Sequence, residues 1–415
     1  MVRVFPFRGL RPIPEKAFEV ASPPYDVLNV QEAKEIVKNH PNSFLRVNKA
    51  DCEFDDRIDP HSKNVYQKAK ENLQLFIKNG LMIQDEQPCF YIYRLTINNQ
   101  RQTGLCCVMS VEDYENGLIK KHEYTRPDKV EDRANHIEYV EAQVGPVFSI
   151  FRNRSEISDL FEQLTQIKPE TSFTSDDGVT HDFWVIKNHS MIKTIQKRFN
   201  TLSCTYIADG HHRSESAAEV VRRKKNNKGF ETLLKPYHYF LQVLFPDDEV
   251  NILSYNRIAK KPKDLSMHEV MFKAESNFNL AINKEGSFSP ETSHTFGVYA
   301  EGNWYRMVLL NSQIKEDDPV REIDAEVLQQ YFVGPILNIK DPKTDERIQF
   351  VGGVRGNKEL ENRVDSGEFD MAFSLYPTTV SQLLNVADAQ KVMPPKSTWF
   401  EPKLRSGMVV HLLTN

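Results

Sequence analysis

The chain has 415 residues, with 53 Lys+Arg against 58 Asp+Glu and a formal net charge of −5. This length predicts two or three domains with a sizeable core. The mildly acidic balance argues against a nucleic-acid groove or an anionic membrane surface, but it leaves room for a small local anion site. No stretch reaches the roughly 18 apolar residues of a membrane helix. The five cysteines form no CxxC pair, so we expect a cytoplasmic protein in a reducing compartment.

The first part of the chain predicts short elements separated by proline and glycine. A helix is expected at 29–40. A stronger helix begins at Asp59-Pro60, with Asp59 as its N-cap, and ends at Asn79-Gly80. Apolar runs on either side of Asn98-Asn99-Gln100 predict a β-hairpin, and Gly145-Pro146 ends a helix at 129–144. The other elements expected before residue 202 are strands at 147–151 and 181–186 and helices near 155–167 and 188–199.

The segment from Leu202 to Phe245 predicts a strand, a DGHHR turn, a helix and a second strand, which together form an α/β unit. From about residue 260 the pattern becomes a mixture of helices and strands, with one strand pair around Glu301-Gly302-Asn303 and a helix at 321–331. We therefore expect an α/β (α+β) fold in three regions. These are an N-terminal extension at 1–87, a core at 88–260 and a C-terminal α+β lobe at 261–415.

Asp209-Gly210-His211-His212-Arg213 stands at the end of a predicted buried strand and the start of a helix. Gly210 permits unusual backbone dihedrals and close approach of a ligand, and a helix N-terminus offers unpaired amide donors. The two histidines add donors, and the Arg213 fork can hold two phosphate oxygens. Asp209 fits beside a phosphate if it holds a magnesium ion that the phosphate also contacts. The pattern predicts an anion site; the plainer alternative is Asp209 as an N-cap.

The loop at 120–133 is dense in acidic, basic and histidine side chains. A loop of this composition between a hairpin and a helix is a candidate for a general base and a cation clamp. Its HE pair is not followed by xxH, so the zinc-protease motif is absent. On composition alone, a solvated charged turn that caps the helix is the better explanation. Its candidate functional residues are His122, Glu123, Thr125, Lys129 and Arg133.

Two Pro-rich segments offer further candidates. Pro23-Pro24-Tyr25-Asp26 is a rigid turn that presents an aromatic ring and a carboxylate, and a structural turn covering the core is equally plausible. The segment at 393–403 could meet an anion through Lys396, Ser397 and Thr398, and a packed C-terminal strap with Trp399 as its anchor is at least equally plausible. We expect the substrate contacts to come from Tyr25, Asp26, His122 and Thr125.

The DGHHR motif, with an HE-containing loop earlier in the chain, resembles the free-serine kinases of the ParB/sulfiredoxin-like superfamily. The resemblance spans nearly the whole chain and implies a ParB/sulfiredoxin-like mixed sheet with an N-terminal helical extension. The chain also resembles a large bacterial, archaeal and protist family, some of whose members are pyrophosphate-dependent L-serine kinases. The segments that carry it are PPYDV, NSFLRVNK, KKHEYTRPDKVEDR, IADGHHR, YNRIA and MPPKSTWFEPKLRSG.

The resemblance implies that L-serine and pyrophosphate react to O-phosphoserine and phosphate, with Mg²⁺ as cofactor. Glu123 would take the serine proton, and Asp209 would position the metal or the substrate. The transferring phosphoryl group would be held by Gly210, His211, His212 and Arg213, and His212 would be catalytic together with Glu123 and Asp209. Further candidates for phosphate contacts, on position and charge alone, are Arg126, Lys129 and Arg133. The compact archaeal kinases place HE and DGHHR closer together in the chain, so here the spatial pairing of Glu123 and Asp209 is an inference.

Three alternatives stay open. The same kinase could use ATP or ADP as its donor. A ParB-like regulator that binds nucleotide or nucleic acid on the same core predicts salt-dependent DNA binding. A sulfiredoxin-type reductase is weaker, because its phosphate loop needs a cysteine where His211 stands. The pattern indicates no particular oligomeric state.

Overall fold

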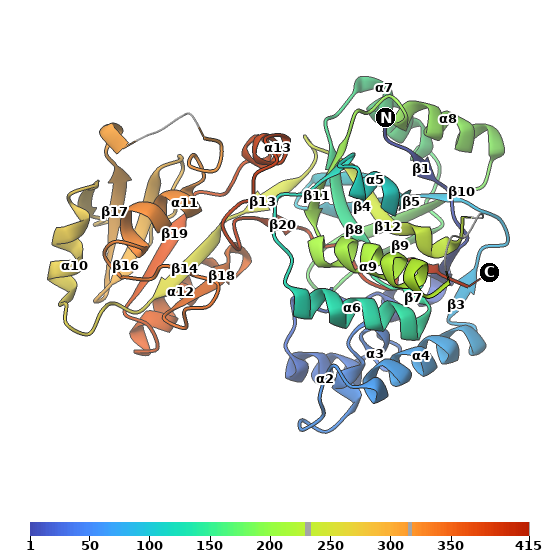
Figure 1. Ribbon diagram of the computed structural model, residues 1–415, viewed down its shortest axis with the longest axis horizontal. Coiled ribbons are helices and arrows are strands. Elements are labelled where there is room, and N and C mark those ends of the chain that lie inside the picture. Colours follow the sequence, from blue (N-terminus) through green and yellow to red (C-terminus); the bar gives the residue numbers. More distant parts are fainter. Residues whose placement is uncertain (229–233, 314–317, 415) are drawn as a thin grey trace. The chain divides into compact units, whose positions relative to one another are not determined.

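The computed structural model describes residues 1–228, 234–313 and 318–414, and these divide into two compact units (Figure 1). The first unit contains Met1–Val250 and Pro402–Asn415, and the second contains Asn251–Glu401. Each unit combines helices with its own β-sheet, so the predicted α+β class is confirmed. The division into three regions and the ParB/sulfiredoxin-like assignment of the core stay predictions.

A mixed sheet forms the centre of the first unit. Within the described residues it has nine strands in the order β6-β11-β8-β12-β5-β4-β10-β9, and β1 pairs with β5 beside this path. The strands are β6 (Ile119–Lys120), β11 (Thr205–Asp209), β8 (Val147–Phe151), β12 (Tyr239–Pro246), β5 (Gln100–Ser110), β4 (Phe90–Ile97), β10 (Thr180–Ile186), β9 (Thr171–Thr174) and β1 (Val4–Phe5).

The strand pairings confirm one sequence prediction and revise another. β4 and β5 form the expected hairpin, and the turn residues Asn98 and Asn99 have φ of 48° and 65°, which suits asparagine in a tight hairpin turn. β11 and β12 flank β8, β11 antiparallel to it and β12 parallel. The expected strand–helix–strand unit is therefore present, but its two strands run in opposite directions and are not neighbours.

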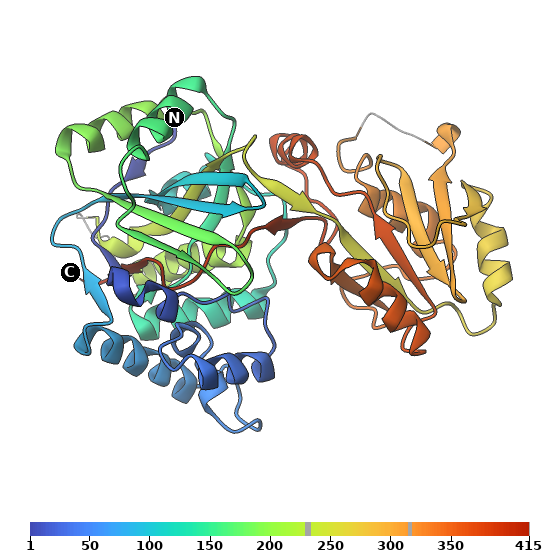
Figure 2. The ribbon, with the colours of Figure 1, turned by 180° about the vertical axis from the view of Figure 1, so that it is seen from behind.

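A smaller sheet in the first unit brings together segments that are far apart in the sequence. Its order is β3-β2-β21-β7, so β21 lies between β2 and β7. Seen from behind, the C-terminal segment, drawn in dark red, runs across the first unit (Figure 2). The strands are β3 (Met82–Gln84), β2 (Gly9–Pro12), β21 (Val410–Leu412) and β7 (Ala142–Gln143).

The helices of the first unit confirm one expected boundary and correct two. α2 (Val30–Asn39) has the capping box of Asn29. α4 (Lys63–Lys78) begins after Ser62, because Asp59 instead accepts a hydrogen bond from the His61 N–H at 2.9 Å and closes a turn. α6 (Pro127–Val140) ends at Glu141, whose φ is 57°, because the next two residues pair with β21. The other α-helices are α1 (Ala17–Val20), α3 (Leu45–Asn48), α5 (Val111–Glu115), α7 (Ser155–Leu164), α8 (His189–Phe199) and α9 (His211–Lys228).

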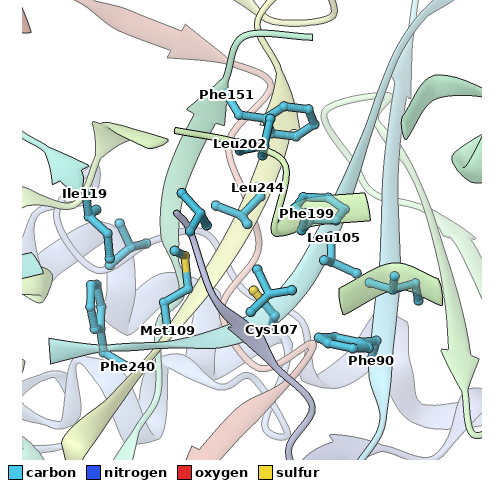
Figure 3. Packing of buried hydrophobic residues seen from close by; sticks show 14 of the residues in the cluster. Phe90, Leu105, Cys107, Met109, Ile119, Phe151, Phe199, Leu202, Phe240 and Leu244 are labelled. Carbon is cyan, nitrogen blue, oxygen red and sulfur yellow. The ribbon is translucent and has the colours of Figure 1, made fainter. Parts of the chain in front are cut away.

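The main core of the first unit packs helices against one face of the mixed sheet (Figure 3). Phe199 and Leu202, on α8 and just after it, meet side chains from the strands, including Phe151 and Leu105. Cys107 is fully buried in this cluster as a free thiol. Among the described residues, no helix has the length and apolar character needed to cross a bilayer.

The second unit is an antiparallel sheet with helices. Within the described residues its six strands are β15 (Phe278–Ile282), β17 (Asn303–Leu309), β16 (Thr295–Ala300), β19 (Met371–Leu375), β14 (Tyr255–Ala259) and β18 (Ile348–Gly352), in that spatial order. β13 (Asn251–Leu253) pairs separately with β20 (Trp399–Glu401). The helices are α10 (Met267–Ala274), α11 (Asp324–Leu328), α12 (Gly356–Asp365) and α13 (Val380–Asp388). The expected helix at 321–331 is α11 continued by a π-helical turn at Gln329–Val333.

Buried histidines make the first unit sensitive to acid. Burial lowers the pKa of His411 to about 4, and its Nε2 lies 3.0 Å from the carbonyl oxygen of Pro236. An unfolded histidine titrates near pH 6.5, so between about pH 6.5 and 4 the unfolded chain binds more protons than the folded one. His411 therefore lowers the free energy of unfolding by about 1.4 kcal/mol for each pH unit of acidification in that window.

We expect His411→Gln, which keeps a donor for the Pro236 carbonyl but does not titrate, to gain stability relative to the wild type as the pH falls from 6.5 to 4.5. Urea titrations of both proteins at several pH values measure this difference. A difference that does not change with pH would contradict the prediction.

Candidate functional site

The two sequence motifs lead directly into α6 and α9, which lie side by side in the first unit (Figure 1). Residues that come later along α6 contact residues that come later along α9. The Arg126 N–H donates to Nε2 of His212 at 3.1 Å, and the Ser216 hydroxyl donates to the Val130 carbonyl at 3.0 Å. The helices therefore run parallel, and both N-termini lie at the same end. Their dipoles together favour an anion there.

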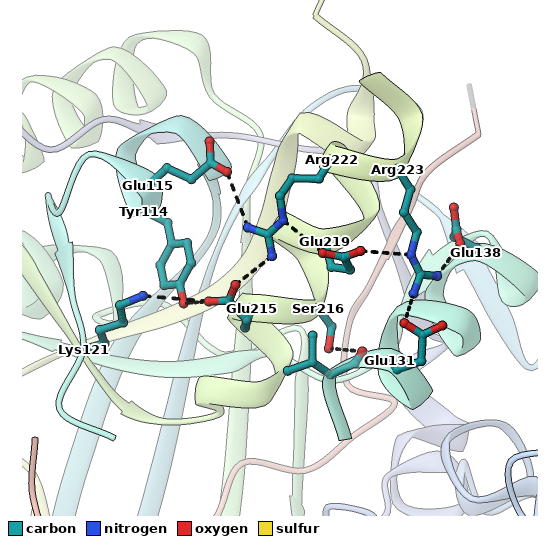
Figure 4. Close-up of polar contacts among 11 residues, drawn as sticks. Tyr114, Glu115, Lys121, Glu131, Glu138, Glu215, Ser216, Glu219, Arg222 and Arg223 are labelled. Carbon is teal, nitrogen blue, oxygen red and sulfur yellow. Dashed lines mark hydrogen bonds and ion pairs between the residues drawn. The ribbon is translucent and has the colours of Figure 1, made fainter. Parts of the chain in front are cut away.

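Side-chain contacts fix α9 against α6 and against the loop before it (Figure 4). Arg223 donates to Glu138 of α6 at 2.9 Å. Glu215 accepts a hydrogen bond from the Tyr114 hydroxyl at 2.5 Å, and the Lys121 ammonium lies 3.8 Å from it. Partly exposed pairs of this kind contribute about 0–1 kcal/mol each. The Lys121 contact joins α9 to the loop that carries Glu123.

Glu123 and His211 face each other where the two loops meet. Nδ1 of His211 lies 3.6 Å from Oε2 of Glu123, and the backbone N–H of His122 donates to Nε2 of His211 at 3.4 Å. Burial, together with the neighbouring His122 ring, holds the pKa of His211 well below its ordinary value, so the ring is neutral. Because Nε2 accepts, the ring proton is on Nδ1 and faces the carboxylate. The Glu123 side chain is 37% exposed.

Asp209 ends β11 and faces two cations. Its Oδ2 lies 3.1 Å from Nζ of Lys403 and 3.6 Å from Nη2 of Arg213. Gly210, the next residue, has a φ of +101°, and a Cβ there would lie 3.0 Å from Nε of Arg213, so the turn requires glycine. Arg213 also donates to the carbonyl of Pro146. The motif therefore gathers positive charge beside one carboxylate, at the N-terminus of α9.

A pocket beside this junction is lined by Tyr25, Arg133 and Arg213, together with Asn48. The Arg133 guanidinium lies 4.4 Å from the centre of the Tyr25 ring. Tyr25 is half-buried, and burial raises the pKa of its hydroxyl to about 12. Asp26 is exposed next to it. The sequence candidates thus fall in two adjoining places, linked by Arg213.

The other sequence candidates lie as follows. The His122 ring is buried, packs edge-to-face on His211 with 4.4 Å between centroids, and has its pKa lowered to about 4 by burial. Thr125 is half-buried in the same loop as Glu123. Lys129 is exposed in the first turn of α6, and within the described part of the chain no ion pair links it to the motif. In the segment at 393–403, Ser397 donates to the Pro394 carbonyl at 2.8 Å.

Two residues near the site were not predicted. Lys403 was noted only as part of the Pro-rich segment, and Asn48 only as part of the NSFLRVNK run. A single lysine or asparagine has no local pattern that marks it as functional. The one available signal was that both fall in segments that carry the family resemblance.

Comparisons with known proteins place the chain in a family. The family model described as "Protein of unknown function (DUF1015)" matches residues 4–326. No curated protein matches the chain. Among solved structures, a free serine kinase in complex with AMP is 12% identical, with a TM-score of 0.35, and covers 71% of this chain and 86% of its own.

Two further structures are similar. SbnI with a C-terminal truncation, from Staphylococcus aureus, is 10% identical with a TM-score of 0.38, over 72% of this chain and 85% of that one. A conserved hypothetical protein from Pyrococcus furiosus is 12% identical with a TM-score of 0.33, over 71% of this chain and 90% of that one. Because the family model spans well over half of the sequence, this protein belongs to the DUF1015 family.

Proposed function

We propose that this protein is a phosphotransferase that moves a phosphoryl group from pyrophosphate to the hydroxyl of free L-serine, giving O-phospho-L-serine and phosphate. The observation that supports this function most is the contact between the loop that carries Glu123 and the DGHHR turn. This contact places the partly exposed Glu123 carboxylate beside the N-termini of two parallel helices. Phosphoryl transfer needs a proton acceptor for the attacking hydroxyl and fixed positive charge for the phosphate oxygens.

In the proposed reaction, Glu123 takes the hydroxyl proton as the serine oxygen attacks phosphorus. The new O–P bond forms while the bridging P–O bond of pyrophosphate breaks, and phosphate leaves with the bonding electrons. Arg213, Lys403 and the amides at the two helix N-termini stabilise the charge on the transferring group. The neutral His211, whose Nδ1 nitrogen lies 3.6 Å from Oε2 of Glu123, orients that carboxylate.

Mg²⁺ belongs to the proposal through Asp209. Among the described residues, no three His, Cys, Asp or Glu side chains gather as a metal site. Mg²⁺ is commonly held by one or two carboxylates plus substrate phosphates and water, and the Asp209 side chain, 30% exposed, fits that mode. Bound there with its phosphates, the ion would neutralise charge on the donor.

A product assay tests the function. The full chain is incubated with L-serine, Mg²⁺ and either pyrophosphate, ATP or ADP, and O-phosphoserine is measured by mass spectrometry. We expect product with pyrophosphate. If product forms only with ATP or ADP, the protein is still a serine kinase, but its donor is a nucleotide and not pyrophosphate. No product with any donor would overturn the kinase, and DNA binding that weakens steeply with salt would then favour the regulator.

Lys403→Gln is expected to raise the KM for the donor about tenfold or more, since charge-assisted hydrogen bonds are worth about 1.5–3 kcal/mol. Lys403→Arg should restore most of the loss. Lys70→Gln is the matched control, because Lys70 also pairs with a carboxylate, Glu141 at 2.7 Å, but lies outside the site. Steady-state kinetics on all three variants measure the effect. Equal donor KM values for Lys403→Gln and Lys70→Gln would contradict it.

A further inference from the structure

The pocket lined by Tyr25, Arg133 and Arg213 also contains a buried polar side chain that has no role in the proposed phosphoryl transfer. Asn48, the last residue of α3, is 2% exposed and lines the pocket. Within the described residues, neither its Nδ2 nor its Oδ1 has a hydrogen-bond partner. An unpaired buried polar group costs about 1–3 kcal/mol. Such groups are rare in folded proteins and call for an explanation.

The surroundings of Asn48 supply a fixed cation. Nη2 of Arg133 lies 2.6 Å from Oδ2 of Asp132, and Nη1 donates to the backbone carbonyl of Asn48 at 3.3 Å. These contacts and the Tyr25 ring hold the guanidinium in one orientation, with its side chain only 16% exposed. A planar, oriented guanidinium in a pocket is suited to a carboxylate or a phosphate.

The pocket adjoins the proposed transfer site through one residue. Arg213 lines the pocket, and its Nη2 also lies 3.6 Å from Asp209. The pocket and Asp209 therefore share Arg213. A short acceptor with its recognition group in the pocket therefore lies beside the DGHHR turn that carries Arg213.

We propose that this pocket binds the α-amino-acid end of the acceptor, which deepens and rests on the proposed function. The acceptor's carboxylate pairs with Arg133 and accepts from Nδ2 of Asn48, and its α-ammonium donates to Oδ1 of the same amide. A phosphate ion satisfies the arginines equally well and near neutral pH carries one or two hydroxyl donors, whereas an α-ammonium carries three N–H donors and its charge for Oδ1. A zwitterion provides a donor and an acceptor together and satisfies both amide atoms. Arg133 then holds the acceptor and not the phosphate.

Titration calorimetry on the full chain tests the proposal without turnover. The probes are L-serine, ethanolamine, which lacks the carboxylate, 3-hydroxypropionate, which lacks the ammonium, and inorganic phosphate. We expect L-serine to bind the wild type at least about tenfold more tightly than either truncated analogue, because each leaves a buried group unpaired. Phosphate that binds with the affinity of L-serine and competes with it would overturn the assignment, as would no binding of L-serine.

The variant Asn48→Ala should weaken L-serine binding about tenfold or more while leaving the thermal unfolding temperature unchanged or higher, since it removes amide groups that have no partner in the ligand-free fold. Asn72→Ala is the matched control. Asn72 is fully buried, and its Nδ2 donates to the Arg46 carbonyl at 2.7 Å. That control should lose stability and keep L-serine affinity. If Asn48→Ala does not fold, Arg133→Lys is measured in the same titration, and unchanged L-serine affinity in it would overturn the proposal.

The two proposals fail separately. Weaker L-serine binding in Asn48→Ala with no O-phosphoserine from any donor supports the pocket and overturns the kinase. O-phosphoserine formation with an unchanged KM for L-serine in Asn48→Ala supports the kinase and overturns the pocket.

Discussion

Glu123→Gln is expected to lower kcat for O-phosphoserine formation by about 10²–10⁴-fold, the usual contribution of a general base. Glutamine has nearly the same shape as glutamate but cannot accept the hydroxyl proton. The KM for the donor should change little, because the phosphate contacts come from the DGHHR turn and Lys403. The measurement is steady-state kinetics with each substrate varied in turn, accompanied by thermal unfolding of both proteins.

Glu115→Gln is the control for this substitution. Its side chain is 38% exposed, against 37% for Glu123, and it pairs with Arg222 at 3.7 Å on the outer side of α9. The same loss of charge at the same exposure should leave kcat within a factor of two or so of the wild type, since surface substitutions change little. If Glu123→Gln keeps the kcat of Glu115→Gln, Glu123 is not the base.

Gly210→Ala is expected to destabilise the first unit by about 1–3 kcal/mol and to lower kcat/KM for the donor sharply. A φ of +101° is strained for alanine, and the added Cβ lies 3.0 Å from Nε of Arg213. The Arg213 side chain has to give by a few tenths of an ångström, which displaces the cation that Asp209 and the pocket share. Urea unfolding and donor kinetics measure the two effects.

Gly117→Ala separates backbone strain from displacement of Arg213. Gly117 has a φ of +75°, and a Cβ there would meet no atom within 4 Å. This control should lose stability for the same backbone reason and retain donor kinetics. Equal donor kinetics in the two variants would show that the position of Arg213 does not matter to the reaction.

The elements that were predicted correctly are determined by residues that are near one another in the sequence. The hairpin at Asn98-Asn99 and the capping box at Asn29 are set by a few consecutive residues, so the sequence pattern was enough. The wrong boundaries have two causes. Asp59 could close a turn or cap a helix, and local sequence does not decide between them. The helix stops at Glu141 because the following residues pair with a strand near the C-terminus.

In the candidate site, too, the part formed by consecutive residues was predicted and the part formed by distant residues was not. The DGHHR turn was recognisable because a strand end, a glycine and a helix start are consecutive. Its partners were not, because Lys403 reaches Asp209 across 194 residues of sequence. Asn48 is a candidate only because its side-chain amide is buried and has no hydrogen-bond partner among the described residues. Only the folded structure shows this.

The return of the chain to the first unit after Glu401 has a consequence for protein synthesis. β21 and Lys403 leave the ribosome only after all of Asn251–Glu401 has been made. At translation rates of about 5–20 residues per second, that delay is roughly 8–30 s. Throughout it, the nascent first unit lacks the strand between β2 and β7, and Asp209 lacks Lys403. The site is therefore completed last, once the whole second unit has been translated.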